Sequence, residues 1–231
     1  DLESVDKKIQ KTERAAKAGD AKAKAELNAL IAYKKVLEEG KPARSLEMEA
    51  DLKSAAIGDL FLLTAKPVIY VANVDEASIL TGNQHVDALK EAVKGEGAEV
   101  ILINAAIEAQ IAEMEDAEER EMFLGEYGLT ESGLDKLIKA SYSLLNLITY
   151  FTAGVKEVRA WTIQKGWKAP QAAGVIHTDF EKGFIRAEVI KLADYQTYKT
   201  ENACKEAGKM GVEGKEYVVA DGDIMHFRFN V

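Results

Sequence analysis

The spacing of apolar residues changes along the chain, and each spacing predicts a different kind of element. In residues 1–39 apolar positions recur every three or four residues, which is the period of paired helices. Gly19-Asp20 interrupts this pattern, and Gly40-Lys41-Pro42 follows it. Because Gly ends helices, Asp caps them and Pro stops them, the pattern predicts an antiparallel helical hairpin with its tip at Gly19-Asp20.

Two short apolar runs come next, Val68-Ile69-Tyr70-Val71 and Val100-Ile101-Leu102-Ile103. Runs without alternation are typical of strands buried on both faces of a parallel sheet. Helical spacing over roughly residues 84–94 lies between them, so the segment predicts a βαβ unit. Around it we expect a helix over 46–63 with a weak point at Gly58-Asp59, acidic helices over about 106–125, and a helix over 134–147 capped at Thr130.

From Ile148 onward the pattern predicts short strands. Residues 149–152 and 158–163 alternate like an antiparallel pair joined at Ala153-Gly154, and a helix opens at Ala169-Pro170 and closes at Gly183. Further strands are expected at 186–190, 217–220 and 224–229, the last two joined by a hairpin turn at Asp221-Gly222. The fold class is therefore α/β plus α+β. The predicted parts are a helical hairpin at 1–45, half of a parallel-sheet domain at 46–147, and a mixed sheet around one helix at 148–231.

Composition narrows the class of protein. The chain has 231 residues, of which 47% are hydrophobic and 30% charged, enough for a sizeable core. Its single cysteine, Cys204, excludes an internal disulfide, and its three scattered histidines have no metal-ligand spacing. Apolar runs are too short to span a bilayer, and no signal peptide is recognisable. We expect a cytoplasmic protein without a membrane partner.

The net charge of −9 is unevenly distributed. Seven basic residues lie between Lys7 and Lys24, against the two acids Glu13 and Asp20. Between Glu96 and Asp135 only Arg120 is basic, against twelve acids. A basic projection on an acidic body predicts contact with a polyanion such as RNA or the ribosome. The candidates are Lys11, Arg14, Lys17, Lys22 and Lys24, although lysine-rich helices are also ordinary solvated faces.

Polar clusters follow both predicted parallel strands: Asn73-Val74-Asp75-Glu76 and Asn104-Ala105-Ala106. Ligands of parallel sheets bind beyond the carboxyl ends of the strands. The first cluster sits where P-loop GTPases carry Asn-Lys-x-Asp, and the second where they carry a Ser-Ala-Lys-type loop. Together with residues 151–161 and 176–186, these motifs closely resemble the YchF subfamily of Obg-like NTPases over essentially the whole chain. The resemblance implies a G domain with an inserted helical hairpin, followed by a ubiquitin-like (β-grasp) TGS domain.

The chemistry of the first cluster bears on which base is bound. An Asp at its fourth position would accept the ring N–H and the amino group of guanine, but here that position is Glu76, one methylene longer. Recognition of guanine by this position is thereby weakened. The resemblance implies a preference for ATP over GTP, with base contacts from Asn73 and Val74. Asn104 replaces the usual small hydroxyl residue, while the backbone amides of Ala105 and Ala106 could still face the base. The alternative interpretation is a solvated strand-to-helix turn.

The chain carries no Gly-x-x-x-x-Gly-Lys-Ser/Thr motif. Gly214-Lys215 is followed by Glu216, so residues 208–215 do not supply one. Without it there is no cradle for phosphates and no hydroxyl for Mg²⁺. We therefore expect a fragment that begins after the phosphate loop and both switches, has no catalytic residue or metal ligand of its own, and cannot hydrolyse a nucleotide alone. An incomplete parallel sheet also predicts self-association.

The remaining histidines and the tryptophans are expected to have structural roles, with one exception. We expect His177 and Asp179 to pack against and cap a helix, and we expect Trp161 to pack in the core. Trp167, in a Gly-Trp-Lys loop, is the aromatic candidate for exposure and for stacking on RNA bases. Two functional hypotheses follow: the C-terminal part of a YchF-type ATPase that docks on ribosomes, or a non-enzymatic RNA or ribosome adaptor. A third interpretation treats the hairpin as a dimerising coiled coil.

Overall fold

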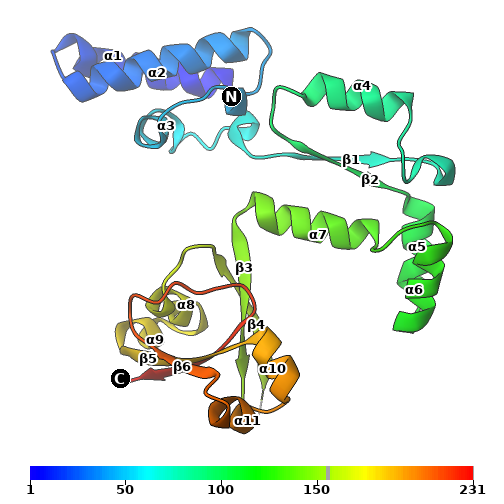
Figure 1. Cartoon of the computed structure of the whole chain (residues 1–231). Helices are drawn as coiled ribbons and strands as arrows, with labels where there is room; N and C mark the ends of the chain where they lie inside the picture. The colour runs from blue at the N-terminus through cyan, green and yellow to red at the C-terminus, as the bar shows by residue number, and fades with distance from the viewer. Residues whose placement is uncertain (155–156, 231) are drawn as a thin grey trace. The chain divides into compact units, whose positions relative to one another are not determined.

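A computed structural model describes residues 1–154 and 157–230 of the chain (Figure 1). The chain divides into two compact units, Asp1–Leu137 and Ile138–Val231, which are described separately below. No helix in the described residues has both the length and the apolar character needed to cross a membrane.

The first unit opens with the predicted hairpin, formed by α1 (Leu2–Lys17) and α2 (Ala21–Glu38) (Figure 1). Gly19 turns the chain at φ +99°, a backbone conformation that favours glycine. The Asp20 carboxylate then accepts hydrogen bonds from the backbone N–H groups of Lys22 and Ala23, which caps α2. Val5, Leu30 and Tyr33 are fully buried. The hairpin and its tip are therefore confirmed.

The segment after the hairpin is less helical than its spacing predicts. It contains the 3₁₀ turn η1 (Ala43–Ser45), the short helix α3 (Ala50–Ile57) and the 3₁₀ turn η2 (Leu63–Ala65). The predicted helix over 46–63 is wrong beyond 50–57, because the helix ends at Gly58 and Phe61 adopts a positive φ of 47°. Ala56, Ile57 and Leu62 instead complete the core beneath the hairpin.

A half-buried polar cluster joins the hairpin base to the sheet of this unit. The Arg44 guanidinium donates to Oε2 of Glu96 from Nε at 3.1 Å and from Nη2 at 2.5 Å. The Tyr70 hydroxyl donates to the same oxygen at 3.0 Å. Only 18% of the Arg44 side chain and 19% of the Glu96 side chain are exposed. Because the pair is shielded from water, removing one partner leaves the other charge poorly solvated, which costs more than breaking a surface ion pair.

This cluster predicts a pH-dependent stability. The hydrogen bond from Arg44 lowers the pKa of Glu96 below its ordinary value. A carboxyl whose folded pKa lies below its unfolded pKa stabilises the fold fully above the unfolded pKa, about 4.3, and loses that contribution as pH falls through the folded pKa. Urea unfolding between about pH 6 and pH 3 should therefore show a shallower acid loss in Glu96→Gln than in the parent.

A matched control is Glu91→Gln, because Glu91 pairs with Lys94 on the open surface, where both side chains are about three-quarters exposed. That variant should retain the parent's pH profile. If the free energy of unfolding fell equally with pH in the parent and in Glu96→Gln, the cluster would not contribute this stability.

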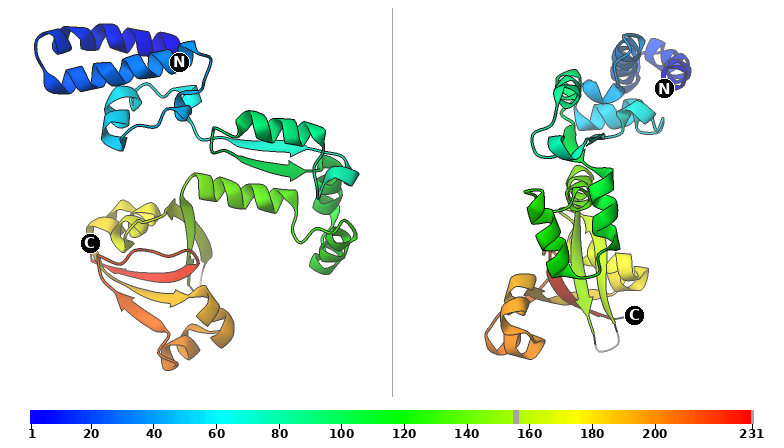
Figure 2. Two further views of the ribbon diagram at one scale, coloured as in Figure 1. Left: turned by 45° about the horizontal axis from the view of Figure 1, so that its top comes forward. Right: turned by 90° about the vertical axis from the view of Figure 1, so that its right-hand side faces the viewer.

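The predicted βαβ unit is present. Strands β1 (Ile69–Asn73) and β2 (Glu99–Ile103) pair in parallel, and α4 (Gln84–Val93) connects them (Figure 2). The expectation that both strands are buried on both faces is wrong, since Val71 is 41% exposed. The reason is that this sheet has two strands in the described residues, too few to bury either strand completely. Self-association stays a prediction.

The acidic segment forms two helices, α5 (Ala105–Glu113) and α6 (Ala117–Glu126), and α7 (Gly133–Leu144) follows. The predicted cap at Thr130 is wrong. Ser132 caps α7 instead, because its hydroxyl lies next to the first turn and accepts from the backbone N–H of Asp135 at 3.0 Å. The Glu108 carboxylate accepts from the N–H groups of Gly133 and Leu134.

The second unit is built on the predicted mixed sheet. Its strands lie in the order β4-β3-β7-β5-β6; β3 and β7 are parallel and the other neighbours antiparallel (Figure 2). The strands are β3 (Leu147–Ala153), β4 (Val158–Gln164), β5 (Phe184–Lys191), β6 (Met210–Glu213) and β7 (Asp223–Phe229). The helices are α8 (Ala169–Ile176), α9 (Thr178–Lys182), α10 (Leu192–Tyr198) and α11 (Glu201–Glu206).

Several details of this unit differ from the prediction. The helix expected from Ala169 to Gly183 is split at His177, whose Nδ1 accepts from the Asp179 N–H and caps α9, as expected of this residue. Residues 217–220 form no strand, and only Val218 makes an isolated bridge, to Lys168. Asp221-Gly222 is therefore a turn that leads into β7 rather than a hairpin turn. At the predicted turn, the Gly154 N–H donates to the Glu157 carbonyl at 2.9 Å, and residues 155–156 lie outside the described residues.

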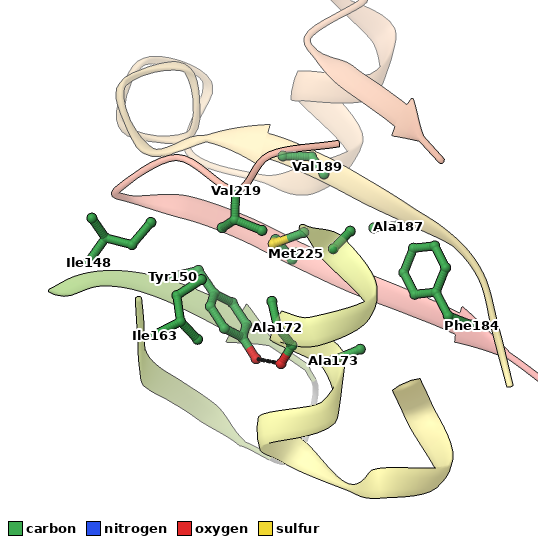
Figure 3. Packing of buried hydrophobic residues seen from close by; sticks show 11 residues of the cluster. Ile148, Tyr150, Ile163, Ala172, Ala173, Phe184, Ala187, Val189, Val219 and Met225 are labelled. Atoms are coloured by element: carbon green, nitrogen blue, oxygen red, sulfur yellow. Dashed lines mark hydrogen bonds between the residues drawn. The ribbon is translucent and has the colours of Figure 1, made fainter. Parts of the chain in front are cut away.

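The core of the second unit lies between the sheet and α8 (Figure 3). Tyr150 of β3 is fully buried there, and its hydroxyl donates to the backbone carbonyl of Ala172 at 2.9 Å. Its ring meets Phe227 edge to face at 5.8 Å between centroids. The small residues Ala172 and Ala173 of α8 let the helix approach the sheet closely.

Candidate functional site

The two predicted base-contacting loops lie at the same edge of the parallel sheet, after β1 and β2. Asn73, the last residue of β1, is exposed, and its Oδ1 accepts from the backbone N–H of Ala105 at 3.0 Å. Ala105 is the first residue of α5 and is also exposed, as is Ala106. The structure therefore brings Asn73, Ala105 and Ala106 together.

The buried side chain of Asn104 links the two loops through hydrogen bonds. It is 6% exposed, and its Oδ1 accepts from the Ile107 N–H at 2.9 Å, which caps α5. Its Nδ2 donates to the backbone carbonyl of Val74 at 2.7 Å. Both ends of one buried amide are thus used to hold the first loop against the start of α5. Sequence reasoning missed this role, although an Asn just before an apolar helix is a capping signal.

The remaining residues of the first loop differ in what they can offer a ligand. The Val74 side chain is buried, and its backbone N–H donates to the Ile103 carbonyl at 2.9 Å. The Asp75 carboxylate accepts from the Ser78 N–H and caps the 3₁₀ turn η3 (Glu76–Ser78). The Glu76 side chain is exposed, and its carboxylate makes no hydrogen bond or ion pair within the described residues. Of the two acids in this loop, Glu76 is therefore the one whose carboxylate faces solvent and remains available to a ligand.

These contacts define the polar groups available at the edge. Oδ1 of Asn73 already accepts from Ala105, and its Nδ2 group makes no hydrogen bond within the described residues. Nδ2 can therefore donate to an acceptor on a ligand, such as a ring nitrogen of a purine, while the second lone pair of Oδ1 can accept from a donor. The exposed Ala105-Ala106 start of α5 adjoins Asn73, and the exposed Glu76 follows it by three residues in the chain.

The basic residues divide into a structural and an exposed group. Lys8 is structural, since it donates to the Asp59 carboxylate at 2.5 Å and also pairs with Glu26, whereas Lys7 is exposed and pairs with Glu3 on the surface. The side chains of the five candidates are exposed near the hairpin tip, and one of them, Lys17, pairs with Glu13 at 2.8 Å. The other four make no ion pair with a described residue: Lys11, Arg14, Lys22 and Lys24.

The two tryptophans both serve the second unit. Trp167, expected to be exposed, is instead partly buried and packs against the core, because residues 217–219 run beside it and the Val219 N–H donates to its carbonyl. Trp161 also packs against this core, and its Nε1 donates to the Thr152 hydroxyl at 2.9 Å.

His226 hydrogen-bonds Glu201 at 2.7 Å, and Cys204 is fully buried. Among the described residues no three His, Cys, Asp or Glu side chains are grouped to hold a metal ion.

Comparison with known proteins finds relatives along the whole chain. The "Ribosome-binding ATPase YchF" of Bacillus subtilis is 53% identical over 233 residues, and that of Escherichia coli O157:H7 is 53% identical over 231. "Obg-like ATPase 1" of Rattus norvegicus is 44% identical over 235 residues. All three matches cover 100% of this chain, but 63%, 63% and 59% of the respective relatives. The chain thus spans about three-fifths of the length of these curated relatives.

Structural and family comparisons agree with this result. A solved structure described as "Structure of the Schizosaccharomyces pombe YchF GTPase" superimposes with a TM-score of 0.83 at 38% identity, over 98% of this chain and 62% of that one. The family model YchF-GTPase_C, described as "Protein of unknown function (DUF933)", matches residues 147–230, which is the sheet of the second unit. Over its whole length the chain is therefore homologous to the YchF subfamily of Obg-like ATPases.

Proposed function

We propose that this chain supplies the base-recognition side of the nucleotide site and the ribosome-facing hairpin of a YchF-type ATPase. The observation that supports the nucleotide role best is the pair of loops after β1 and β2, which Asn104 and the Asn73–Ala105 hydrogen bond hold side by side. A base site needs such pre-ordered loops, since ordering them on binding would reduce affinity.

The base in this proposal is adenine, with guanine bound less well. Asn73 donates from Nδ2 to a ring nitrogen, and the start of α5 at Ala105 and Ala106 lines the base. Val74 fixes the position of the loop through its buried side chain and its backbone hydrogen bonds to Asn104 and Ile103. Glu76 carries its carboxylate one methylene further out than an aspartate would, so it is poorly matched to the adjacent N–H groups of guanine. A misplaced partner of this kind can discriminate strongly between two bases.

The phosphate chemistry belongs to a part of the ATPase that residues 1–231 do not contain. A phosphate loop cradles the phosphates and provides a hydroxyl for Mg²⁺, and that motif is missing from this sequence. Mg²⁺ in the complete site would neutralise charge on the phosphates. The residues of this chain would hold and orient the base, and none of them takes part in the chemical step.

The two other parts of the chain carry the contact with the ribosome. We assign the second unit, with its mixed sheet over α8, as a ubiquitin-like TGS domain, and the hairpin as a coiled-coil arm with a basic tip. The printed name of the bacterial relatives, "Ribosome-binding ATPase", supports ribosomal RNA or protein as the partner. Work on ribosomes would place the protein in the cytoplasm.

The proposal predicts that ATP hydrolysis requires the phosphate loop of a complete ATPase in addition to this chain. The purified 231-residue chain should show no ATP hydrolysis above background, because its sequence contains no phosphate-loop motif. A chimera in which it replaces the matching 233 residues of the Bacillus subtilis relative should hydrolyse ATP in the presence of Mg²⁺. Release of inorganic phosphate measures both. Turnover by the chain alone would contradict the assignment of roles.

A second candidate function is a non-enzymatic RNA or ribosome adaptor. The observation that favours it is that the basic tip is present in this chain while a phosphate loop is absent. The same chimera discriminates between the two functions: an adaptor would bind ribosomes with equal affinity with and without ATP and would not turn ATP over.

A further inference from the structure

The sheet of the second unit has one edge that lacks the usual protection. In the described part of the chain β4 pairs only with β3 and forms one edge, and β6 forms the other. Proteins protect free edges with short strands, charged residues, prolines or bulges. β6 is short, with four residues. β4 has seven residues and one charge, Arg159, whose guanidinium lies 4.1 Å from the centre of the Trp161 ring. β4 is therefore open to pairing.

The hydrogen bonds at the two ends of β4 identify the groups that face outward. The Lys165 N–H donates to the Asn146 carbonyl at 2.7 Å, and the Gly154 N–H donates to the Glu157 carbonyl at 2.9 Å. Because hydrogen-bonded pairs alternate along an antiparallel ladder, the odd-numbered residues of β4 bond to β3. The even-numbered residues direct their N–H and C=O groups away from β3. They are Val158, Ala160, Thr162 and Gln164, and all four are exposed.

A cavity of about 720 Å³ adjoins this edge, within the size range of ligand sites. It lies on the sheet face that carries Ala160 and its cross-strand partner Phe151. Ile138 and Tyr142 of α7 form one wall, and the Tyr142 hydroxyl is 3.2 Å from the Thr162 hydroxyl. The exposed surface of its lining is predominantly apolar, and its charged residues are Lys139, Lys165 and Asp221, whose carboxylate accepts from the Thr149 N–H at 2.8 Å.

We propose that β4 is a docking strand for a protein partner: an extended acidic segment adds to its outer edge and inserts a bulky apolar side chain into the cavity beside Ala160. Three features select this occupant. Outward N–H and C=O groups on alternate residues match the backbone of an extended peptide, while the adjacent apolar cavity accepts one of its side chains. Lys165, which forms no ion pair with a described residue, favours an acidic flank. This site is independent of the proposed nucleotide function.

The first test selects ligands without assuming a partner. A phage-displayed library of random peptides is panned against the complete chain, and the enriched peptides are synthesised. Amide hydrogen exchange with these peptides should show new protection at Val158, Ala160 and Thr162, whereas the amides of Trp161 and Ile163 are protected already. Failure to enrich peptides, or protection confined to another surface, would overturn the proposal. So would protection at β4 that rises with chain concentration without peptide, since the occupant would then be a second copy.

Substitutions at Ala160 give the second test. Ala160→Pro removes an outward N–H group but no hydrogen bond to β3, and edge strands tolerate proline. Ala160→Glu keeps the N–H group and places a carboxylate beside the cavity, where it repels an acidic peptide. Each variant should weaken peptide binding about tenfold or more in fluorescence anisotropy. Val212→Glu is the control, since Val212 is 63% exposed on the other edge strand and should leave binding unchanged. Parent-like affinity in both Ala160 variants would refute the docking strand.

Discussion

Reversing four charges near the tip of the hairpin should weaken ribosome binding by about a thousandfold at low salt. The variant carries Glu at Lys11, Arg14, Lys22 and Lys24, the candidate residues that form no ion pair with a described residue. Each of these cations could neutralise a phosphate and release a counterion, so the loss should be large and the remaining binding should depend less steeply on salt. Co-sedimentation with ribosomes over a range of salt concentrations measures both quantities.

The hairpin itself should survive this change. Glu is as good a helix former as Lys, and two of the new acids lie in the first turn of α2, where negative charge is favourable. A control variant with Glu at the exposed residues Lys90, Lys182, Lys205 and Lys215 changes the net charge equally. If the two variants lost affinity to the same extent, the hairpin tip would not be the principal ribosome contact.

Replacing Tyr150 with alanine should lower the free energy of unfolding of the second unit by about 3–5 kcal/mol. The ring is fully buried and meets Phe227 edge to face, so its removal leaves a cavity. The Ala172 carbonyl of α8 also loses its hydrogen bond from the hydroxyl, which Figure 3 shows. Tyr150→Phe keeps the ring and removes only the hydroxyl, which should cost about 1 kcal/mol.

Tryptophan fluorescence is the appropriate probe, because both tryptophans, Trp161 and Trp167, lie in the second unit. Urea unfolding followed in this way reports that unit alone. Tyr198→Ala is the control: Tyr198 is 37% exposed at the end of α10, and its loss should cost less than about 1 kcal/mol. A Tyr150→Ala variant as stable as Tyr198→Ala would show that the core is not centred on Tyr150.

The sequence was most informative where structure depends on local signals. The hairpin tip follows from Gly19 and Asp20 alone, and the βαβ unit follows from two apolar runs and the helical spacing between them. Both are determined by residues close together in the chain, and both are confirmed. The helix end at Gly183 is confirmed for the same reason.

Prediction failed where distant residues determine the outcome. β6 becomes a strand because it pairs with β5 from Ala187 to Ile190, and nothing in its four residues reveals that partner. α10 and α11 were also missed, being short helices that pack Cys204 under the sheet. Trp167 was expected to be exposed because its loop contains Gly and Lys, but residues 217–219 cover it.

The candidate base site shows the same division. The residue types in the loops after β1 and β2 were found from the sequence, since polar clusters after buried strands are a local signal. The bond from Asn104 to the Val74 carbonyl could not be predicted, because it depends on how the two loops pack once β1 and β2 have paired. That bond turns two separate motifs into one pre-ordered edge.

The affinity of ATP for the chimera with the Bacillus subtilis relative, compared with its Asn73→Ala variant, tests the base site most directly. Our account predicts that Asn73→Ala weakens ATP binding about tenfold or more in equilibrium dialysis, because a donor to the base is lost and the Ala105 N–H loses its partner. His85→Ala, an exposed residue on α4, should bind ATP like the parent. Equal ATP affinities for the parent and Asn73→Ala would contradict the assignment of these loops to the base.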